Sequence, residues 1–302
     1  METIVSIITV SLNAASTIRD TLDSVRYQKV PFGVEHICID GGSTDGTRSI
    51  IEEAAAFSGG IIYSFEPDKG LFDAMNKGLH LARGRYILFL NADDFLVGSL
   101  SVANAFYSID LDAGAPDMVM GDVIMAHLDR FSLWRKRRVP RWLPRYPRLG
   151  AHPPHQGNFI RRELLLRLGG FDSHQRLAAD TTQFYRLVHE FNATMVASRT
   201  IVSFMRMGGA SNDKLSSFSK GNGETFRFLL QYKSPVAAAL TVFVKMFQKL
   251  LEYRIGRLRR GAYLRFHRLE RNNLVPTHQA TVAVENAKPK CAATVGRHKE
   301  RT

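Results

Sequence analysis

The sequence predicts an α/β protein with a mixed, mostly parallel β-sheet flanked by helices and followed by a basic helical extension. Three observations support this prediction. Apolar, β-rich segments alternate with segments of helical periodicity through the first hundred residues, which is typical of parallel sheets. Acidic residues directly follow two of the apolar segments, where open α/β sheets bind their ligands. The second half of the chain is basic and largely helical in pattern.

The strand and helix signals of the first hundred residues alternate regularly. The expected strands are residues 3–12, 34–40, 60–66 and 85–90. The expected helices lie between them, at residues 14–28, 47–57 and 70–82. In the first helix the apolar residues recur at helical spacing and fall on one face, at Ile18, Leu22 and Val25. We expect residues 1–98 to form the ligand-binding half of a single domain.

The pattern weakens after residue 98 and returns near residue 159. Residues 130–155 hold eight arginine or lysine residues and five prolines, and this proline density predicts an irregular loop. A helix is expected at 159–168, ended by two glycines, and another at 181–191. We expect three further regions: the second half of the domain at 99–213, a basic amphipathic helical extension at 214–271, and a disordered tail at 272–302.

The charge of the chain is unevenly distributed. The net charge is +13, but residues 1–130 carry −9 and residues 131–302 carry +22. This asymmetry predicts that the second half meets an anionic surface, either nucleic acid or phospholipid. We expect no nucleic acid, because the sequence shows no recognition motif of that class and its basic residues accompany an apolar helical face.

That apolar face predicts a contact with an anionic membrane surface. Its residues are Leu240, Phe243, Val244, Phe247, Leu250 and Leu251. The largely apolar run at 236–244 is far shorter than the roughly 20 residues needed to span a bilayer, so the helix is expected to lie on a membrane. The N-terminus lacks a leader pattern, and Cys38 and Cys291 lack disulfide or zinc spacing. We expect a cytoplasmic protein, peripheral on the inner face of the cell membrane.

Three carboxylates lie at expected strand ends. Asp40 closes the second strand, and the adjacent Asp93 and Asp94 follow the fourth. Oxygen ligands at this place suit a hard divalent cation, Mg²⁺ or Mn²⁺, which usually keeps substrate phosphates in its shell. Two adjacent aspartates also occur in exposed turns, and the pattern alone leaves that alternative open.

Six motifs carry a resemblance to a known family. They are TVSLN (9–13), IDGGSTDGT (39–47), EPDKGLFDAMNKG (66–78), FLNADD (89–94), HQGNFIRRELLLRLGGFD (155–172) and LAADTTQFYRL (177–187). In order and spacing they resemble the family 2 glycosyltransferases with the GT-A (Rossmann-like) fold. The resemblance is strongest to bacterial members that build exopolysaccharide, O-antigen and colanic acid units, and it covers about residues 3–213.

The resemblance implies donor-binding roles near the first strand ends. Asp40 is expected to accept a hydrogen bond from the N–H of the donor's uracil, with the backbone of Val10 lining the same pocket. The alternative for Asp40 is to cap the following turn. Asp73 and Lys77 are expected to contact the donor's ribose or phosphate, or to form a surface ion pair at i, i+4. Many relatives have two acids in the second motif, where this chain has Asp40 and Gly41.

The resemblance also implies a metal site. Asp93 corresponds to the final aspartate of the family's D-x-D motif and is expected to bind the Mg²⁺ or Mn²⁺ that bridges the donor diphosphate. This cation would stabilise the charge of the leaving group. Asp94 is expected to assist the metal or to orient Asp93. The first D-x-D position is Asn91, which supplies an oxygen without a negative charge, so a modest metal affinity is expected.

Asp180 falls where the family places its catalytic base. An acceptor hydroxyl is a poor nucleophile until its proton is removed, and inversion by single displacement needs one such base. The alternative is that Asp180 is the N-cap of the helix that follows it. His155, beside Gln156, is expected to contact the acceptor or the diphosphate, or to be structural.

The expected protein is an inverting glycosyltransferase for cell-surface polysaccharide biosynthesis. It would move one sugar from a nucleotide-diphosphate sugar, UDP being the favoured nucleotide, to a saccharide acceptor on polyprenyl diphosphate. Residues 1–98 would bind the donor and residues 99–213 the acceptor. A non-catalytic nucleotide-sugar-binding module and a nucleotidylyltransferase remain alternatives, although the latter should show a glycine-rich basic loop where this chain has SLNAAST. The spacing of GGSTDG argues against a dinucleotide-dependent dehydrogenase.

Overall fold

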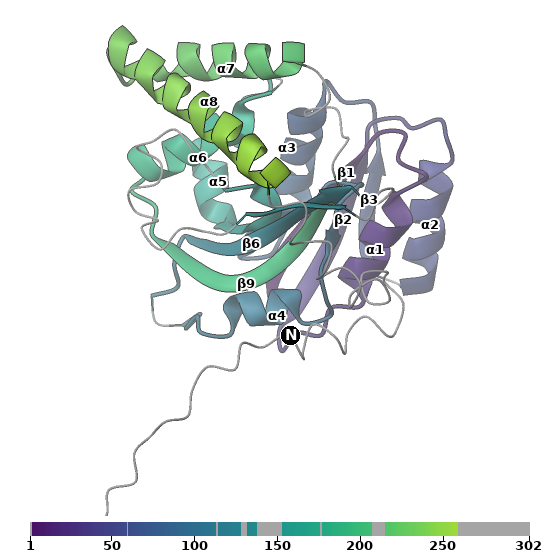
Figure 1. Cartoon of the computed structure of the whole chain (residues 1–302). Coiled ribbons are helices and arrows are strands. Elements are labelled where there is room, and N and C mark those ends of the chain that lie inside the picture. Colours follow the sequence, from purple (N-terminus) through teal and green to yellow (C-terminus); the bar gives the residue numbers. More distant parts are fainter. Residues whose placement is uncertain are drawn as a thin grey trace, which may run out of the picture.

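The first half of the chain forms the predicted alternation of strands and helices (Figure 1). The computed structural model describes residues 2–58, 60–112, 114–127, 132–137, 153–175, 177–206 and 215–258. The strands of the first half are β1 (Thr3–Ser11), β2 (Gly33–Asp40), β3 (Ile61–Phe65) and β4 (Tyr86–Phe89). The helices between them are α1 (Ile18–Arg26), α2 (Thr47–Ser58) and α3 (Leu71–Leu81).

The second half extends the sheet and adds helices. Its elements up to the last strand are β5 (Phe95–Leu96), α4 (Ser101–Phe106), β6 (Met118–His127), β7 (Ser132–Arg137), the 3-10 turn η2 (His155–Gly157), β8 (Asn158–Arg161), α5 (Arg162–Leu168), α6 (Ala179–His189) and β9 (Met195–Arg206). The extension consists of α7 (Leu215–Leu229) and α8 (Pro235–Leu258).

Two predictions for the second half need correction. The predicted loop at 130–155 contains β7, which is possible because the first proline of that segment is Pro140. The helix predicted from residue 159 begins at Arg162, because the preceding residues pair as β8 with β4 and β6. The remaining predictions for the basic segment 138–152, for the end of the extension at 259–271 and for the tail 272–302 fall outside the described residues.

All strands join one mixed sheet in the order β3-β2-β1-β4-β8-β6-β9-β5, with β7 paired to β6. The pairs among β1 to β4 are parallel, as predicted. The second half is mixed: β8 is antiparallel to both neighbours, whereas β6 and β9 are parallel. Because β2 and β4 lie on opposite sides of β1, the chain reverses its direction across the sheet there, and such a point is where open α/β sheets bind ligands.

Two apolar clusters cover the two faces of the sheet. β1 contributes to both, because successive side chains of a strand point to opposite faces. Ile8 lies in one cluster with residues of α3, α5 and α6, and Ile7 lies in the other with residues of α1 and α4. Both side chains are fully buried. Burial on two faces explains why β1 carries apolar side chains at successive positions rather than in strict alternation with polar ones.

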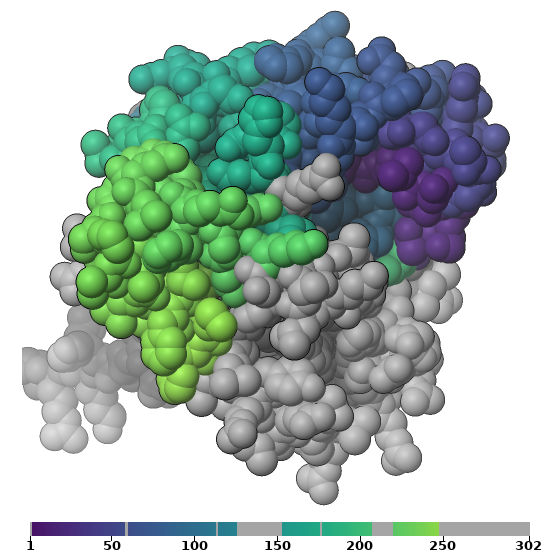
Figure 2. All heavy atoms as spheres, turned by 90° about the horizontal axis from the view of Figure 1, so that it is seen from above, coloured from purple at the N-terminus to yellow at the C-terminus, as the bar shows by residue number. Residues whose placement is uncertain are grey.

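The extension packs on the second half of the domain. Tyr185 of α6, Phe228 and Leu229 of α7 and Ala238 of α8 form a small apolar cluster. Figure 2 shows α7 and α8 in green at the left of the molecule, whereas the N-terminal residues, in purple, lie at the right. Within the described ranges, we find no helix that is both long and apolar enough to cross a membrane.

Candidate active site

The carboxyl ends of β2, β1 and β4 bring the predicted donor-binding residues to one edge of the sheet. Ser11 at the end of β1 pairs with Asp40 at the end of β2. On the other side of β1, the N–H of Ala92 donates to the carbonyl of Val10 over 3.3 Å. The turn after β4, which carries Asp93, therefore lies one strand away from Val10 and two strands away from Asp40, about 10 Å at the usual strand spacing.

The carboxylate of Asp40 is directed into the turn after β2. Its Oδ1 accepts hydrogen bonds from the N–H groups of Gly42 and Ser43, at 3.1 and 2.8 Å. Its Oδ2 accepts bonds from the hydroxyls of Ser11 and Ser43, at 2.8 and 2.6 Å. A carboxylate offers about four acceptor positions, and here four donors occupy them. The geometry favours the turn-capping alternative for Asp40.

A second carboxylate, which is not among the predicted site residues, lies beside this turn. A side chain at Gly41 would overlap with the carboxylate of Asp68, whose Cγ lies 2.9 Å from the place of the missing Cβ. Asp68 is only partly buried, and its Oδ1 accepts a hydrogen bond of 2.9 Å from the N–H of Gly70. Asp68 therefore occupies the space above Gly41.

Asp73 and Lys77 hold the loop that carries Asp68. The side chain of Asp73 accepts a hydrogen bond of 3.0 Å from the N–H of Lys69. Lys77 donates to the carbonyl of Pro67 over 2.8 Å, and its Nζ lies 3.8 Å from Asp73. The ion pair that the sequence offered as one alternative is present. Both residues lie in the first two turns of α3 and contact the backbone of the loop.

The adjacent Asp93 and Asp94 have different environments. Asp94 is 1% exposed, and its two carboxylate oxygens accept bonds of 3.0 Å from the side-chain amide of Gln156 and from the N–H of Arg206. Its backbone carbonyl accepts the hydroxyl of Thr21 over 2.6 Å. Asp94 thus ties the turn after β4 to α1, η2 and β9. Asp93 remains partly exposed.

Burial raises the pKa of both carboxyl groups. For Asp94 the charge of Asp93 adds to the increase, and its pKa lies well above the usual value. The positive charge of Arg206 acts in the opposite direction on both groups, although burial prevails. The guanidinium of Arg206 pairs with Asp20, and its Nη1 is buried without a hydrogen-bond partner among the described residues. The carboxyl groups of Asp93 and Asp94 therefore lie in a poorly solvated turn, close to the guanidinium that Arg206 contributes from β9.

The residues of this turn fit a divalent cation. The side-chain oxygen of Asn91 is buried and has no hydrogen-bond partner among the described residues, so it is available as a ligand. Asp93 supplies a carboxylate, whereas both oxygens of Asp94 are already engaged. The described parts of the chain contain no group of three or more Asp, Glu, His or Cys residues that could hold a metal. Substrate phosphates and water would have to complete the shell, as is usual for Mg²⁺.

The predicted acceptor-side residues come from other elements. Asp180 lies in the first turn of α6, where its Oδ1 accepts a hydrogen bond of 2.6 Å from the N–H of Thr181. The N-cap of α6 is Ala178, so the alternative role of Asp180 as N-cap is wrong. His155 lies half-buried in η2, next to the Gln156 that contacts Asp94. The sequence offered no signal for Arg206, which lies 112 positions from Asp94.

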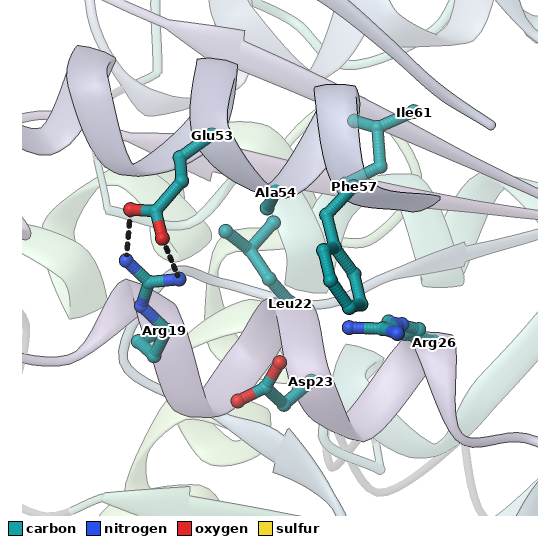
Figure 3. Close-up of a pocket in the computed structure, with 8 residues that line it drawn as sticks. All are labelled: Arg19, Leu22, Asp23, Arg26, Glu53, Ala54, Phe57 and Ile61. Atoms are coloured by element: carbon teal, nitrogen blue, oxygen red, sulfur yellow. Dashed lines mark hydrogen bonds and ion pairs between the residues drawn. The ribbon is translucent and has the colours of Figure 1, made fainter. Parts of the chain in front are cut away.

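A cavity of about 210 Å³ lies away from these residues, between α1 and α2 (Figure 3). On one side of the cavity, Arg19 donates two hydrogen bonds to the carboxylate of Glu53, at 2.6 and 3.4 Å. On the other, the guanidinium of Arg26 stacks on Phe57. None of the predicted site residues lines it. We therefore place the candidate site at the strand ends.

Comparisons with curated proteins find glycosyltransferases. The chain is 32% identical over 177 residues to an uncharacterized glycosyltransferase of Mycobacterium tuberculosis, a match that covers 58% of this chain and 65% of that protein. The chain thus spans just under two thirds of that relative. It is 32% identical over 220 residues to a PGL/p-HBAD biosynthesis glycosyltransferase of Mycobacterium bovis, covering 68% of this chain and 78% of the relative.

Solved structures and a family model agree with the fold. A mannosyltransferase from Pyrobaculum calidifontis, in complex with GDP-Man and Mn²⁺, has a TM-score of 0.57 at 17% identity, covering 95% of this chain and 79% of that one. S. aureus TarS with UDP-GlcNAc has a TM-score of 0.56 at 18% identity, covering 80% and 70%. These likenesses confirm the predicted GT-A fold. The model "Glycosyl transferase family 2" matches residues 6–161, and the chain belongs to this family.

Proposed function

We propose that the chain transfers one sugar, with inversion, from a UDP-sugar to a saccharide acceptor carried on polyprenyl diphosphate. The observation that supports this best is the turn after β4, where the unpartnered oxygen of Asn91 and the carboxylate of Asp93 lie beside the end of β1. Nucleotide sugars in the two similar solved structures support the class of donor. In the proposed assignment, the nucleoside lies toward β2 and the diphosphate toward β4.

The proposed metal ligands are Asp93 and Asn91. A Mg²⁺ or Mn²⁺ ion held there would neutralise charge on the leaving nucleoside diphosphate as the glycosidic bond breaks. Asp94 acts as the residue that positions Asp93, because its own oxygens are engaged by Gln156 and Arg206. Asn91 carries no charge, so we expect the metal to bind weakly without the donor diphosphate.

Asp180 is the proposed base. The acceptor hydroxyl oxygen attacks the anomeric carbon, its proton passes to the carboxylate of Asp180, and the electron pair of the broken C–O bond leaves with the nucleoside diphosphate. One displacement inverts the configuration. The Oδ1 of Asp180 accepts hydrogen bonds from the N–H and the hydroxyl of Thr181, at 2.6 and 3.3 Å. His155, next to Gln156 in η2, is assigned to the side of the site where the acceptor and the diphosphate meet.

Attachment to an anionic membrane surface is part of the proposal. Of the predicted apolar face of α8, the side chains of Leu240, Phe243 and Phe247 are more than half exposed, and Val236 extends this stripe at helical spacing. Val244 is partly buried, and the side chains of Leu250 and Leu251 lie outside the described residues. Lys245 points the other way, with its Nζ 3.3 Å from the hydroxyl of Thr181 on α6. An outward apolar stripe on a basic extension suits a helix that lies in the headgroup region. Such an attachment would hold the site close to a lipid-linked acceptor.

The proposal is tested by binding first and transfer second. The purified chain is titrated calorimetrically with UDP, GDP and dTDP, each with Mn²⁺ and then with excess chelator. We expect Mn²⁺-dependent binding of UDP. Release of UDP from a bound UDP-sugar on addition of a lipid-linked saccharide would then establish transfer. UDP binding without transfer to any acceptor would favour the non-catalytic module, and consumption of a nucleoside triphosphate would favour a nucleotidylyltransferase.

A further inference from the structure

We propose that the donor's uracil is recognised by Asp68 and that Asp40 positions the turn beneath it. This inference rests on the proposed function, since it concerns the base of the same UDP donor. It starts from the hydrogen bonds of Asp40. The four donors around its carboxylate come from Ser11, Gly42 and Ser43, and the side chain is 1% exposed. A base N–H would have to displace one of these donors to reach it.

Asp68 has the properties that Asp40 lacks. Its side chain is partly exposed, and its Oδ2 is directed over Gly41, where the absence of a Cβ leaves room for it. A side chain at position 41 would require the carboxylate of Asp68 to move from its observed place. The carboxylate beside position 41 thus comes from the loop between β3 and α3.

This loop is held in a defined position. Three hydrogen bonds fix three successive parts of it: Lys77 to the carbonyl of Pro67, Gly70 N–H to Asp68 Oδ1, and Lys69 N–H to Asp73. A carboxylate that is oriented before the ligand arrives loses little rotamer freedom on binding. Asp73 and Lys77 therefore act in donor binding through Asp68.

The orientation of the carboxylate favours uracil over guanine. Oδ1 is engaged by the N–H of Gly70, and Oδ2 is the oxygen above Gly41. One presented oxygen matches the single imide N–H of uracil. Guanine offers two neighbouring N–H donors on one edge, and a carboxylate pairs with them best when both of its oxygens face the base.

The test uses binding of UDP and of UDP methylated at N3 of uracil, in the presence of Mn²⁺. The wild-type chain should bind UDP about tenfold more tightly than the methylated form, because the methyl group removes the donor. Asp68→Asn should lose this discrimination and bind UDP about tenfold more weakly, with an unchanged melting temperature. Glu66→Gln, the same change of charge two residues away on an exposed side chain, should keep both the affinity and the discrimination.

A swap of the two positions tests the geometry directly. Gly41→Asp alone should weaken UDP binding, since its side chain would overlap with Asp68. The double variant Gly41→Asp/Asp68→Gly should recover most of the affinity and the discrimination against N3-methylated UDP. Recovery would show that a carboxylate at either position can make the same contact with the N3 hydrogen of uracil.

Several results would overturn the inference. If Asp68→Asn keeps wild-type affinity and discrimination, Asp68 does not contact the base. If Asp40→Asn instead loses discrimination while it melts as the wild type does, the contact belongs to Asp40. Tighter binding of GDP than of UDP would overturn the assignment to uracil but leave a glycosyltransferase with another donor. If the wild type binds none of the three nucleoside diphosphates, the inference and the proposed function fall together.

Discussion

The side-chain amide of Gln156 donates a hydrogen bond of 3.0 Å to the carboxylate of Asp94, 62 residues away in the sequence. The N–H of Arg206 occupies the other oxygen of the same carboxylate. Asp94 is therefore part of the scaffold that joins β4, η2 and β9, whereas Asp93 is partly exposed and is the acid that we propose to face the ligand. The two adjacent aspartates should respond differently to the same substitution.

Replacement of Asp93 and of Asp94 by alanine separates the two roles. Asp93→Ala should remove the Mn²⁺-dependent part of UDP binding and leave the melting temperature close to that of the wild type. Asp94→Ala should lower the free energy of unfolding by about 2–4 kcal/mol, because it leaves two buried donors without an acceptor. Calorimetric titration and urea unfolding measure the two effects. Equal losses of stability in both variants would contradict this division.

His36 should make the protein sensitive to acid. Its imidazole is buried in β2 with Nε2 2.9 Å from the hydroxyl of Thr9, and burial lowers the pKa of His36 to about 4. In the unfolded chain the imidazole of His36 becomes protonated near pH 6.5. The unfolded chain therefore binds more protons than the folded chain between pH 4 and 6.5. Stability should fall by about 3 kcal/mol as the pH drops through this window. In His36→Gln, urea unfolding should show that fall reduced, and an unchanged pH profile would contradict the assignment.

Asp180→Asn should abolish transfer and leave UDP binding nearly intact. The base acts on the acceptor hydroxyl, and its loss typically costs about 10²–10⁴ in rate. Single-turnover transfer and calorimetric UDP titration give the two readouts. Glu190→Gln, near the C-terminal end of the same helix, is the control and should transfer at the wild-type rate. The role would be ruled out by a variant that turns over normally, or by one that no longer binds UDP.

The apolar stripe of α8 should govern attachment to vesicles. Replacing Leu240 and Phe243 by glutamine should reduce co-sedimentation with anionic vesicles by at least about tenfold, since each large side chain contributes about 1.5–3 kcal/mol when it leaves water. Tyr107→Gln is a matched control, because Tyr107 is 90% exposed on another part of the surface. A double variant that still sediments like the wild type would exclude this stripe as the attachment site.

The order of the elements could be predicted from the sequence because it depends on local patterns. Strand runs, helical periodicity and closing glycines are read over a few residues, and the first four strands and their helices agree with the structure. Local patterns could not predict β8, which takes the place of the first residues of the helix predicted from 159. The residues of β8 are strand because β4 and β6 provide partners on both sides.

The sequence by itself determined the parallel half of the sheet, the edge at which acidic residues gather, and the outward apolar stripe of α8. Only the tertiary structure decided which acids are buried and engaged by other residues. Asp94 is engaged by Gln156 and Arg206, and Asp68 comes to lie over Gly41 from 27 residues away. The physical reason is that a carboxylate's availability depends on the donors and the space around it. Those come from segments that are distant in the chain and meet only through packing.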